Sequence, residues 1–372
     1  MDIYAAKREG QNRRKRTVSM EKKKIVVGMS GGVDSSVTAW LLKQQGYEVL
    51  GVTMRHFSGM DEIEREAALA AEQLGISWEA ADVRDAFSEQ VMEEFAREYA
   101  MGRTPNPCVI CNRKIKWEAL LRYAAGRGAD RIATGHYARI CSLPNGRLSI
   151  ANASSATKDQ TYALYRLTQE QLKHTEMPLG EYSKEEVRQM ARQAGLSVAQ
   201  KKDSQEICFI PDHDYAAFIR RFAGEEKAGS ALLPGNFVDR EGTVLGRHKG
   251  IIHYTIGQRK GLNLAMGHPV FVTGIRPDTQ EVVIGENEDL FSTKLLCGRI
   301  NLMAEERLEG ERRLLGRIRY GHKGTMCRVR EAGEGLWECE FEEPVRAVTA
   351  GQSAVFYEDG HIFGGGIIEG RG

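Results

Sequence analysis

Between residues 22 and 137, short apolar runs alternate with segments of helical periodicity, and this alternation most constrains the fold. KKIVVG (23–28), YEVLGVTM (47–54) and DRIATGHY (130–137) have the composition of buried strands, and the stretches between them have the apolar spacing of helices. Strands that alternate with helices indicate right-handed crossovers and a parallel sheet covered on both faces. We therefore expect a doubly wound α/β domain whose ligands bind at the carboxyl ends of its strands.

The loop after the first strand, GMSGGVDSS from Gly28 to Ser36, is suited to binding an anion. Glycines allow successive backbone N–H groups to point at one ligand, and the helix that follows adds its positive end. Asp34 would repel a bare phosphate, so its carboxylate predicts a divalent cation between loop and phosphate. The loop has no lysine of the G-x-x-x-x-G-K-[ST] type and does not match G-x-G-x-x-G.

The second half of the chain has a different pattern. A glycine-rich stretch begins near Phe222, and from Leu295 onward short strand-like pieces alternate with turn residues. This spacing is typical of a small antiparallel β-barrel. We therefore expect four segments: a tail (1–21), the α/β domain (22–213), a small central domain (214–282) and a C-terminal β-barrel domain (283–372).

The first twenty residues, MDIYAAKREGQNRRKRTVSM, are polar and basic without any apolar period. They are either a disordered tail ahead of a natural start at Met20 or a basic arm that touches RNA phosphates. The whole chain has 52 Lys and Arg against 51 Asp and Glu, so no overall charge excess indicates a nucleic-acid partner. No apolar run reaches the ~20 residues that span a bilayer, and no secretory signal is present. We expect a cytoplasmic protein with no membrane partner.

The seven cysteines predict reactive rather than structural sulfur. An odd number in a chain without a signal argues against a disulfide framework. Cys108 and Cys111 form a C-x-x-C pair, a pattern more often metal-binding or redox-active than inert, and Cys208 follows about a hundred residues later. The other four have strand-like apolar surroundings and are expected to be small buried hydrophobes: Cys141, Cys297, Cys327 and Cys339.

Several motifs carry a resemblance to known enzymes. SGGVDS resembles the pyrophosphate-binding loop of the ATP pyrophosphatase (PP-loop) superfamily, which splits ATP between the α- and β-phosphates. From about Lys22 to its end, the chain resembles the tRNA-specific 2-thiouridylase family in GMSGGVDSS, GRTPNPCVICNRKIKW, TGHYAR, KDQTYALY, KKDSQEICFI, GQRKGL, RIRYGH and GQSAVFY, which occur in that order. The resemblance implies an ATP-dependent tRNA-uridine 2-sulfurtransferase. Such an enzyme adenylates the C2 oxygen of wobble uridine 34 and replaces that oxygen with sulfur from a cysteine persulfide.

The resemblance also implies cofactors and partners. ATP is bound with Mg²⁺, and the tRNAs for lysine, glutamate and glutamine are the substrates, gripped by the central and C-terminal domains. A cysteine desulfurase, or a relay protein behind it, supplies the sulfur. AMP turns the poorly leaving C2 oxygen into a good leaving group, and a persulfide is the soft anionic nucleophile that displaces it. The base must leave its stack for this chemistry.

Residue roles follow from the same resemblance. Cys111 takes the position of the nucleophile and Cys208 that of the persulfide carrier, with a transient disulfide between them during turnover. ATP would be bound by Gly28, Met29, Ser30, Gly31, Gly32, Val33, Asp34, Ser35, Met54 and Gly135, with Mg²⁺ at Asp34 through the nucleotide. The tRNA and its target base would contact Asn106, Pro107, Cys108, His136, Lys158, Asp159, Gln160, Arg319, Tyr320 and Gln352.

Cys108 departs from the family pattern, which has aspartate at this position. Cys108, Cys111 and Cys208 could therefore hold a [4Fe–4S] cluster with one open iron, so that the same reaction would run through different sulfur chemistry. Two further readings stay open. A PP-loop ligase that adenylates a small molecule would leave Cys111 and Cys208 idle, and an RNA-binding module with a structural metal would leave the SGGVDS loop without a purpose.

Overall fold

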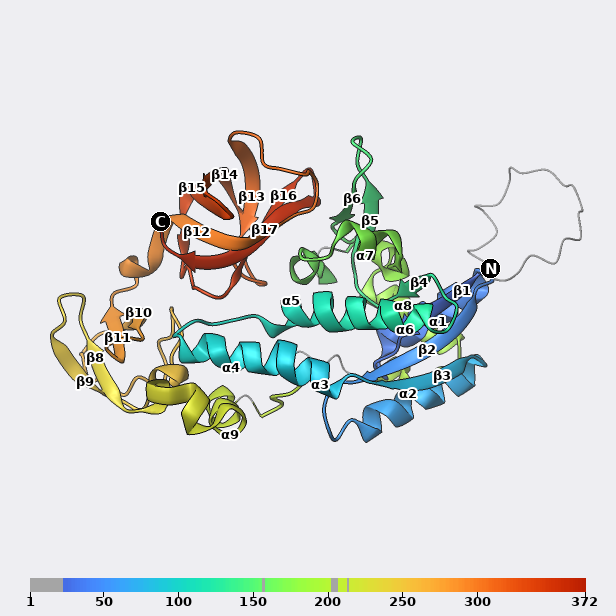
Figure 1. The fold of residues 1–372 in the computed structure, drawn as a ribbon, viewed down its shortest axis with the longest axis horizontal. Helices are drawn as coiled ribbons and strands as arrows, with labels where there is room; N and C mark the ends of the chain where they lie inside the picture. Colours follow the sequence, from blue (N-terminus) through green and yellow to red (C-terminus); the bar gives the residue numbers. More distant parts are fainter. Residues whose placement is uncertain (1–22, 156–157, 202–206, 213) are drawn as a thin grey trace, which may run out of the picture.

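The computed structural model describes residues 23–155, 158–201, 207–212 and 214–372 (Figure 1). The tail expected at 1–21 lies outside these residues, as does part of the KKDSQEICFI segment, 202–206. Within the described ranges, no helix is both long and apolar enough to cross a membrane.

The expected doubly wound parallel sheet is confirmed. Its five strands run in the order β3-β2-β1-β4-β7, and all neighbouring pairs are parallel. The central strand is buried on both faces, which explains its uninterrupted apolar run. Val26 lies in one core, while Ile25 and Val27 lie in the other. The strands are β1 (Lys24–Gly28), β2 (Glu48–Arg55), β3 (Ser77–Asp82), β4 (Arg131–Ala133) and β7 (Thr175–Glu176).

Helices cover both faces of this sheet. The core around Ile25 and Val27 includes residues of α1 (Val33–Gln44), α2 (Asp61–Leu74) and α8 (Lys184–Gln193), with η7 (Ser197–Gln200) at its edge. The core around Val26 includes residues of the helices on the other face. These are α3 (Arg84–Phe87), η2 (Ser88–Met92), α4 (Glu93–Ala100), α5 (Pro107–Cys111), η3 (Asn112–Ala119), α6 (Leu120–Ala125), η5 (Thr161–Leu164) and α7 (Gln169–Lys173), while η6 (Pro178–Glu181) packs against α1.

The cysteine segment is helical. Helix α5 begins at Pro107, whose fixed φ suits the first helical position, and the Asn106 side chain caps the helix by accepting from the N–H of Cys108. The helix continues through the π-helical segment η3 into α6. Cys108 and Cys111 therefore lie in the first turns of one long helical stretch.

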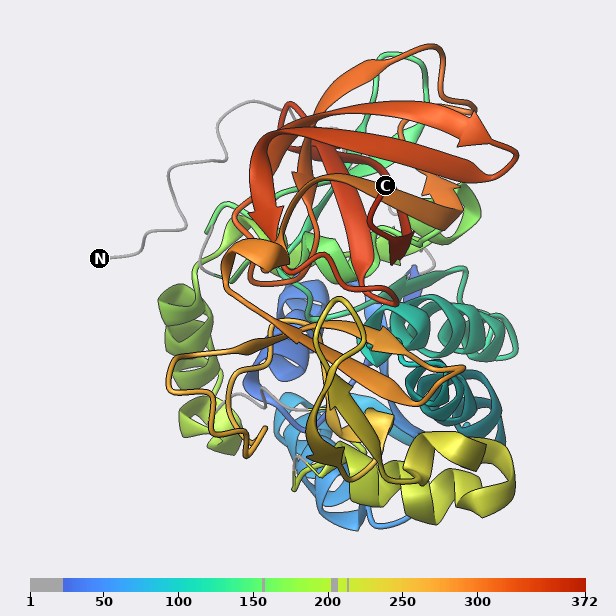
Figure 2. The ribbon, with the colours of Figure 1, turned by 90° about the vertical axis from the view of Figure 1, so that its left-hand side faces the viewer.

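The central unit is a small sheet with a helix. Its strands lie in the order β10-β11-β8-β9, with β8 and β11 parallel and the other pairs antiparallel. Figure 2 looks from the side of this unit, with the C-terminal barrel above it. The elements are α9 (Tyr215–Ala228), η8 (Gly229–Leu232), β8 (Gly235–Val238), β9 (Val244–His248), η9 (Ile251–His253), β10 (Phe271–Arg276) and β11 (Glu281–Gly285), followed by η10 (Glu288–Leu290).

The expected antiparallel barrel is also confirmed. Six strands follow the order β12-β15-β14-β13-β16-β17, and β12 pairs with β17 to close the ring. Cys297, Cys327 and Cys339 are buried in its core as predicted, whereas Cys141 lies outside it and is only half-buried. The strands are β12 (Phe291–Leu302), β13 (Arg312–Arg317), β14 (Thr325–Gly333), β15 (Leu336–Arg346), β16 (Ser353–Glu358) and β17 (His361–Gly370).

A hairpin from the first half of the chain extends this barrel sheet. Strands β5 (Arg139–Ser142) and β6 (Leu148–Ala151) pair with each other, and β6 meets β17 at Ala151 and His361. The Ser149 hydroxyl also donates to the carbonyl oxygen of Ile362 at 2.6 Å. The α/β unit and the barrel thus share one sheet, which the sequence pattern did not predict.

Candidate active site

The loop between β1 and α1 is built for close backbone packing. Gly31 has φ +64°, and a Cβ there would lie 2.8 Å from the carbonyl oxygen of Ile63. Ser30 N–H donates to the Ser35 hydroxyl (3.1 Å), which in turn donates to the carbonyl oxygen of Gly32 (3.2 Å). The loop is therefore held in shape by its own serines, as an anion-binding loop must be before a ligand arrives.

The first turn of α1 is open to a ligand. Its N-cap is Gly32, and no side chain caps the helix there. The N-terminal N–H groups of this twelve-residue helix therefore keep their capacity to bind an anion. Gly135, predicted to let the backbone approach ATP, packs against this turn: a Cβ would lie 2.9 Å from the Asp34 carbonyl carbon and the Ser35 nitrogen.

Asp34 has a cationic partner that the sequence did not reveal. The ammonium group of Lys184, the first residue of α8, lies 2.8 and 2.9 Å from its two carboxylate oxygens, and Tyr137 donates a hydrogen bond at 2.8 Å. Lys184 is buried, so this charge is fixed beside the loop. The loop thus has a nearby lysine, supplied by a distant helix, and the role of Asp34 toward Mg²⁺ stays a prediction.

Four predicted ATP contacts show how tightly the loop is packed. Met29, Val33 and Met54 are buried in the two cores, whereas Gly28 would bring a Cβ to 3.3 Å from Leu120. These packing contacts explain why the four residues are apolar or small. Binding of ATP by these residues stays a prediction.

The cysteines differ in exposure. Cys108 and Cys208 are exposed, and Cys111 is buried. Burial raises the pKa of the Cys111 thiol to about 12, and Lys116 opposes this elevation, while the neighbouring Cys208 and Cys108 add to it. Although Cys208 is exposed as a whole, partial desolvation of its sulfur raises its pKa as well. The three thiols are thus within electrostatic reach of one another.

The three thiols do not form a ready metal site. In the residues that the structure describes, no group of three or more His, Cys, Asp or Glu side chains is placed to hold a metal ion. The [4Fe–4S] ligand set of Cys108, Cys111 and Cys208 therefore stays a prediction.

Lys116 supplies the positive charge of this region. Its charge acts to lower the pKa values of four neighbouring groups: Cys111, Cys208, His56 and His136. For the two thiols, this effect opposes the larger effect of burial. Lys116 lies in the π-helical segment, whose i→i+5 hydrogen bonds turn the chain less per residue than an α-helix does, so it is brought toward the face of Cys111. It is half-buried and makes no hydrogen bond or ion pair with any described residue. The sequence offered a signal, because Lys116 lies in the NRKIKW motif.

His136 joins the start of α1 to the helical stretch of α5, η3 and α6, here called the cysteine helix. The preceding residue packs on α1, while the His136 ring lies 5.3 Å from that of Trp117 on the cysteine helix. Burial, with Lys116, lowers the pKa of His136 to about 3, so the ring is neutral near pH 7. Its Nδ1 is 2.9 Å from the Thr134 hydroxyl.

Tyr320 lies in the turn between β13 and β14 of the barrel. It is 54 % exposed, and its hydroxyl donates to the carbonyl oxygen of Asp159 (3.3 Å). Burial is the largest cause of its raised pKa, followed by the charge of Asp159. The structure therefore brings Tyr320 together with Asp159, another predicted RNA contact. The neighbouring Arg319 donates to the carbonyl oxygen of Arg346 (2.8 Å).

Two predicted RNA contacts are already used by the protein. The Asp159 carboxylate accepts hydrogen bonds from Thr161 (2.8 Å) and Arg317 (3.2 Å). Gln160 accepts from the N–H of Tyr137 (3.0 Å). These side chains fix the segment between the hairpin and the site, and a direct contact with RNA stays a prediction for them and for Lys158.

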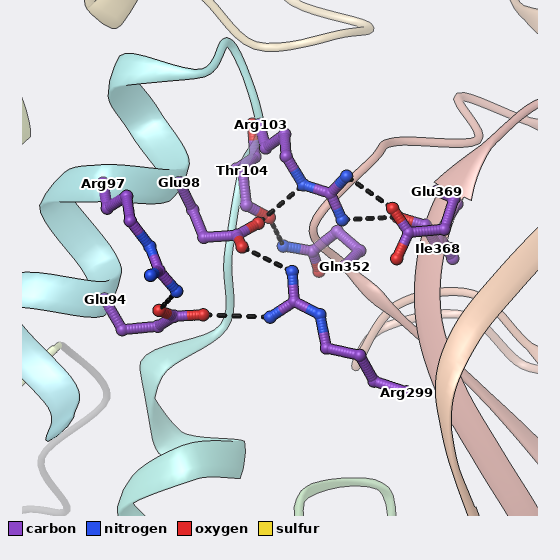
Figure 3. Close-up of polar contacts among 9 residues, drawn as sticks. All are labelled: Glu94, Arg97, Glu98, Arg103, Thr104, Arg299, Gln352, Ile368 and Glu369. Carbon is purple, nitrogen blue, oxygen red and sulfur yellow. Dashed lines mark hydrogen bonds and ion pairs between the residues drawn. The ribbon is translucent and has the colours of Figure 1, made fainter. Parts of the chain in front are cut away.

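Gln352 holds the segment that enters the cysteine helix. Its amide nitrogen donates to the carbonyl oxygen of Thr104 at 2.7 Å (Figure 3), and the N–H of Thr104 donates to the carbonyl oxygen of Ala350. The Thr104 hydroxyl is 3.3 Å from that of Thr255 in the central unit. All three parts of the molecule therefore meet two residues before Asn106, where the helix is capped.

Comparisons with known proteins agree with this architecture. Three family models match in order: a tRNA methyl transferase HUP domain at 23–212, a tRNA methyl transferase PRC-barrel domain at 225–286, and an aminomethyltransferase β-barrel domain at 292–368. The tRNA-specific 2-thiouridylase MnmA of Lachnoclostridium phytofermentans is 52% identical over 359 residues, covering 93% of this chain and 99% of the relative. The chain belongs to the tRNA-specific 2-thiouridylase family.

Other members of the 2-thiouridylase family match over a similar length. The enzyme of the same name from Clostridium perfringens is 49% identical over 362 residues, covering 94% of this chain and 99% of the relative. Among solved structures, the U34-tRNA thiolase NcsA from Methanococcus maripaludis with its [4Fe-4S] cluster aligns over 55% of this chain and 69% of its own, at 19% identity and a TM-score of 0.34. The family resemblance expected from the motifs is thus confirmed by relatives of full length.

Proposed function

We propose that this chain 2-thiolates the wobble uridine of tRNA, using ATP to activate the C2 oxygen and cysteine sulfur to replace it. Membership of the 2-thiouridylase family over 93% of the chain supports the reaction. One observation carries the proposal: Gly135 packs on the first turn of α1, while the adjacent His136 contacts the cysteine helix. An activated base and a sulfur nucleophile can therefore meet across this segment.

The loop between β1 and α1, together with Lys184, activates ATP. The uncapped N–H groups of α1 bind the departing pyrophosphate, and the Lys184 ammonium group adds positive charge. The uridine C2 oxygen attacks the α-phosphorus, and pyrophosphate leaves. Mg²⁺, when bound through the nucleotide beside Asp34, neutralises phosphate charge. The other predicted ATP contacts lie in or beside this loop.

Sulfur transfer falls to two cysteines. The terminal sulfur of a persulfide on Cys208 attacks C2, and AMP leaves with the former C2 oxygen. The Cys111 thiolate then attacks the Cys208 sulfur, so that a Cys111–Cys208 disulfide forms and the sulfur stays on C2 as 2-thiouridine. A thiol reductant restores both cysteines. Lys116 opposes the elevation of both thiol pKa values and thereby favours the anions that react.

The remaining roles follow the family assignment. Asn106, Pro107 and Cys108 border the extruded uridine, and Tyr320 offers an exposed ring on which a base can stack. The substrates are the tRNAs for lysine, glutamate and glutamine, a cysteine desulfurase or relay protein donates the sulfur, and the reaction takes place in the cytoplasm. The cluster-dependent route and the small-molecule ligase are the alternatives that the experiment below must exclude.

The test is thiolation of an unmodified lysine tRNA with ATP and a persulfide donor, followed by mass spectrometry of the nucleosides. Protein purified without oxygen is assayed for iron and acid-labile sulfide in parallel. We expect Cys111→Ala and Cys208→Ala to abolish 2-thiouridine, and Cys108→Ala to retain it, as should the control Cys141→Ala on β5. Stoichiometric iron that is lost with activity in Cys108→Ala would contradict the persulfide route. Adenylation of a small molecule without tRNA would contradict the proposed substrate.

A further inference from the structure

A cavity of about 340 Å³ lies beside the cysteine helix. Three of its lining residues belong to this helix: Ile110, Arg113 and Lys114. Its other walls come from η2 and α4, from the segment after η5 and from barrel strand β12, so that the cavity lies between the α/β unit and the barrel. It is lined by Glu89, Gln90, Glu94, Ile110, Arg113, Lys114, Arg166 and Arg299.

Positive charge in this cavity exceeds negative charge. Four cationic side chains line it against two carboxylates, and Glu94 is already bonded to Arg299 and to Arg97 (Figure 3). Lys114 is paired outside the cavity, with Glu118 at 3.2 Å. Arg113 and Arg166 remain, and neither side chain makes a hydrogen bond or an ion pair with any residue of the described ranges.

Arg166 is the least favourable of these charges without a ligand. Its Nε is buried and lacks a hydrogen-bond partner. Burial and then the nearby charges of Arg113 and Arg299 lower its pKa. A buried donor without a partner and like charges held together both cost free energy. An anion placed between the guanidinium groups would remove both costs at once.

We propose that this cavity binds a phosphodiester group of the tRNA backbone through Arg113 and Arg166. Paired guanidinium forks match phosphate geometry and retain their charge at any working pH. The chain already has a separate place for nucleotide phosphates at the loop of α1, and its substrate under the proposed function is a polyanion. A phosphate here would touch the cysteine helix and, through Arg299, the barrel. The inference rests on the proposed tRNA substrate.

The experiment measures binding of unmodified lysine tRNA by the full chain at several salt concentrations. For Arg113→Gln and Arg166→Gln, we expect weaker binding by about tenfold and a shallower plot of log K against log[salt], by about 0.7 to 0.9 for each phosphate that is no longer neutralised. Arg166→Lys should retain the salt slope, since the charge remains. It should still bind tRNA more weakly than the wild type, because lysine lacks the guanidinium fork. The matched control is Arg122→Gln, a 77 % exposed arginine farther along the same helical stretch.

Two further readouts separate a ligand site from a structural one. Because Arg113 and Arg166 repel each other, neither glutamine variant should melt below the wild type. The KM for ATP should also stay unchanged.

An unaltered salt slope and affinity in both variants would overturn the proposal, and so would a lowered Tm that accounts for the weaker binding. Binding of inorganic phosphate that disappears in the variants while tRNA binding does not change would assign the cavity to a free anion instead. Failure of the wild type to bind tRNA at all would count against the proposed function.

Discussion

Arg299 of the barrel donates a hydrogen bond to the buried Glu98 carboxylate of α4, with 2.7 Å between Nη2 and Oε1 (Figure 3). Arg103 donates to the other oxygen of Glu98 at 2.6 Å and also reaches Glu369 on β17. One carboxylate thus joins the barrel to the helix that precedes the cysteine segment. Burial alone would raise the pKa of Glu98, but the hydrogen bond from Arg299 and the two arginine charges hold it below 4.5.

Glu98→Gln should destabilise the protein by about 3 kcal/mol, because it removes the buried carboxylate that Arg299 and Arg103 share and leaves them only Glu94 and Glu369 as charge partners. In the wild type, the contribution of Glu98 should be complete above pH 4.5 and fall as the pH drops through the lowered pKa, since its pKa is lower in the folded than in the unfolded chain. Urea unfolding between pH 3.5 and 7 measures both effects. Glu306→Gln, at an 89 % exposed carboxylate, is the control and should change stability by less than about 0.5 kcal/mol. Equal effects of the two variants would show that the pairing of Glu98 contributes nothing.

Gly351→Ala should disturb the entrance to the cysteine helix. Gly351 has φ +90°, and its added Cβ would lie 2.9 Å from the backbone nitrogen of Thr104. We expect the free energy of unfolding to fall by about 2–3 kcal/mol and thiolation to become slower. Gly360→Ala is the control, because Gly360 has φ +78° but its added Cβ would have its nearest contact only at 3.9 Å. This variant has the backbone strain without the clash, and its free energy of unfolding should fall by about 1 kcal/mol. Thermal unfolding and single-turnover rates compare the two, and a Gly351 variant no worse than the Gly360 variant contradicts this account.

Gly135→Ala should impair ATP use selectively. The new methyl group would press on the backbone of Asp34 and Ser35 at 2.9 Å and displace the first turn of α1. We expect kcat/KM for ATP to fall by about 100-fold, with tRNA affinity unchanged. Gly126→Ala is the matched control, since Gly126 has φ −64° and its Cβ would meet only Tyr123 at 3.5 Å and Arg122 at 3.8 Å. Normal ATP kinetics in the Gly135 variant would mean that this turn does not bind the nucleotide.

Lys116→Gln should make Cys111 less reactive. Removing the positive charge raises the pKa of the thiol further, so less thiolate is present at any given pH. Alkylation of Cys111 by iodoacetamide should slow on the order of tenfold, and the pH profile should move to higher pH. Lys116→Arg should restore much of the rate by restoring the charge. Lys173→Gln, a 61 % exposed lysine on α7, should behave as wild type. Identical pH profiles for Lys116→Gln and wild type would rule out this electrostatic role.

The sequence predicted the elements whose signal is local. The period of the apolar residues predicted the parallel sheet, the glycines and serines of 28–36 predicted a loop between the first strand and its helix, and evenly spaced turns predicted the barrel. In each case, neighbours along the chain determine the structure. The buried cysteines of the barrel followed from their strand-like surroundings in the same way.

Contacts between distant segments were not predictable in this manner. Lys184 lies 150 residues from Asp34, and nothing in the pattern around either residue indicates their pairing. Asp159 and Gln160 looked available for RNA because their partners, Arg317 and Tyr137, are brought to them only by the fold. Lys116 was missed for another reason: its importance depends on the π-helical turn that brings it toward the face of Cys111.

The shared sheet of β6 and β17 makes residues 139–151 and the C-terminal strand mutually dependent. A fragment that stops after the α/β unit would expose the edge of the β5–β6 hairpin, and a barrel produced alone would lack its neighbour along β17. Exposed strand edges are sites of aggregation. The barrel and residues 139–151 therefore form one structural unit whose parts are far apart along the chain.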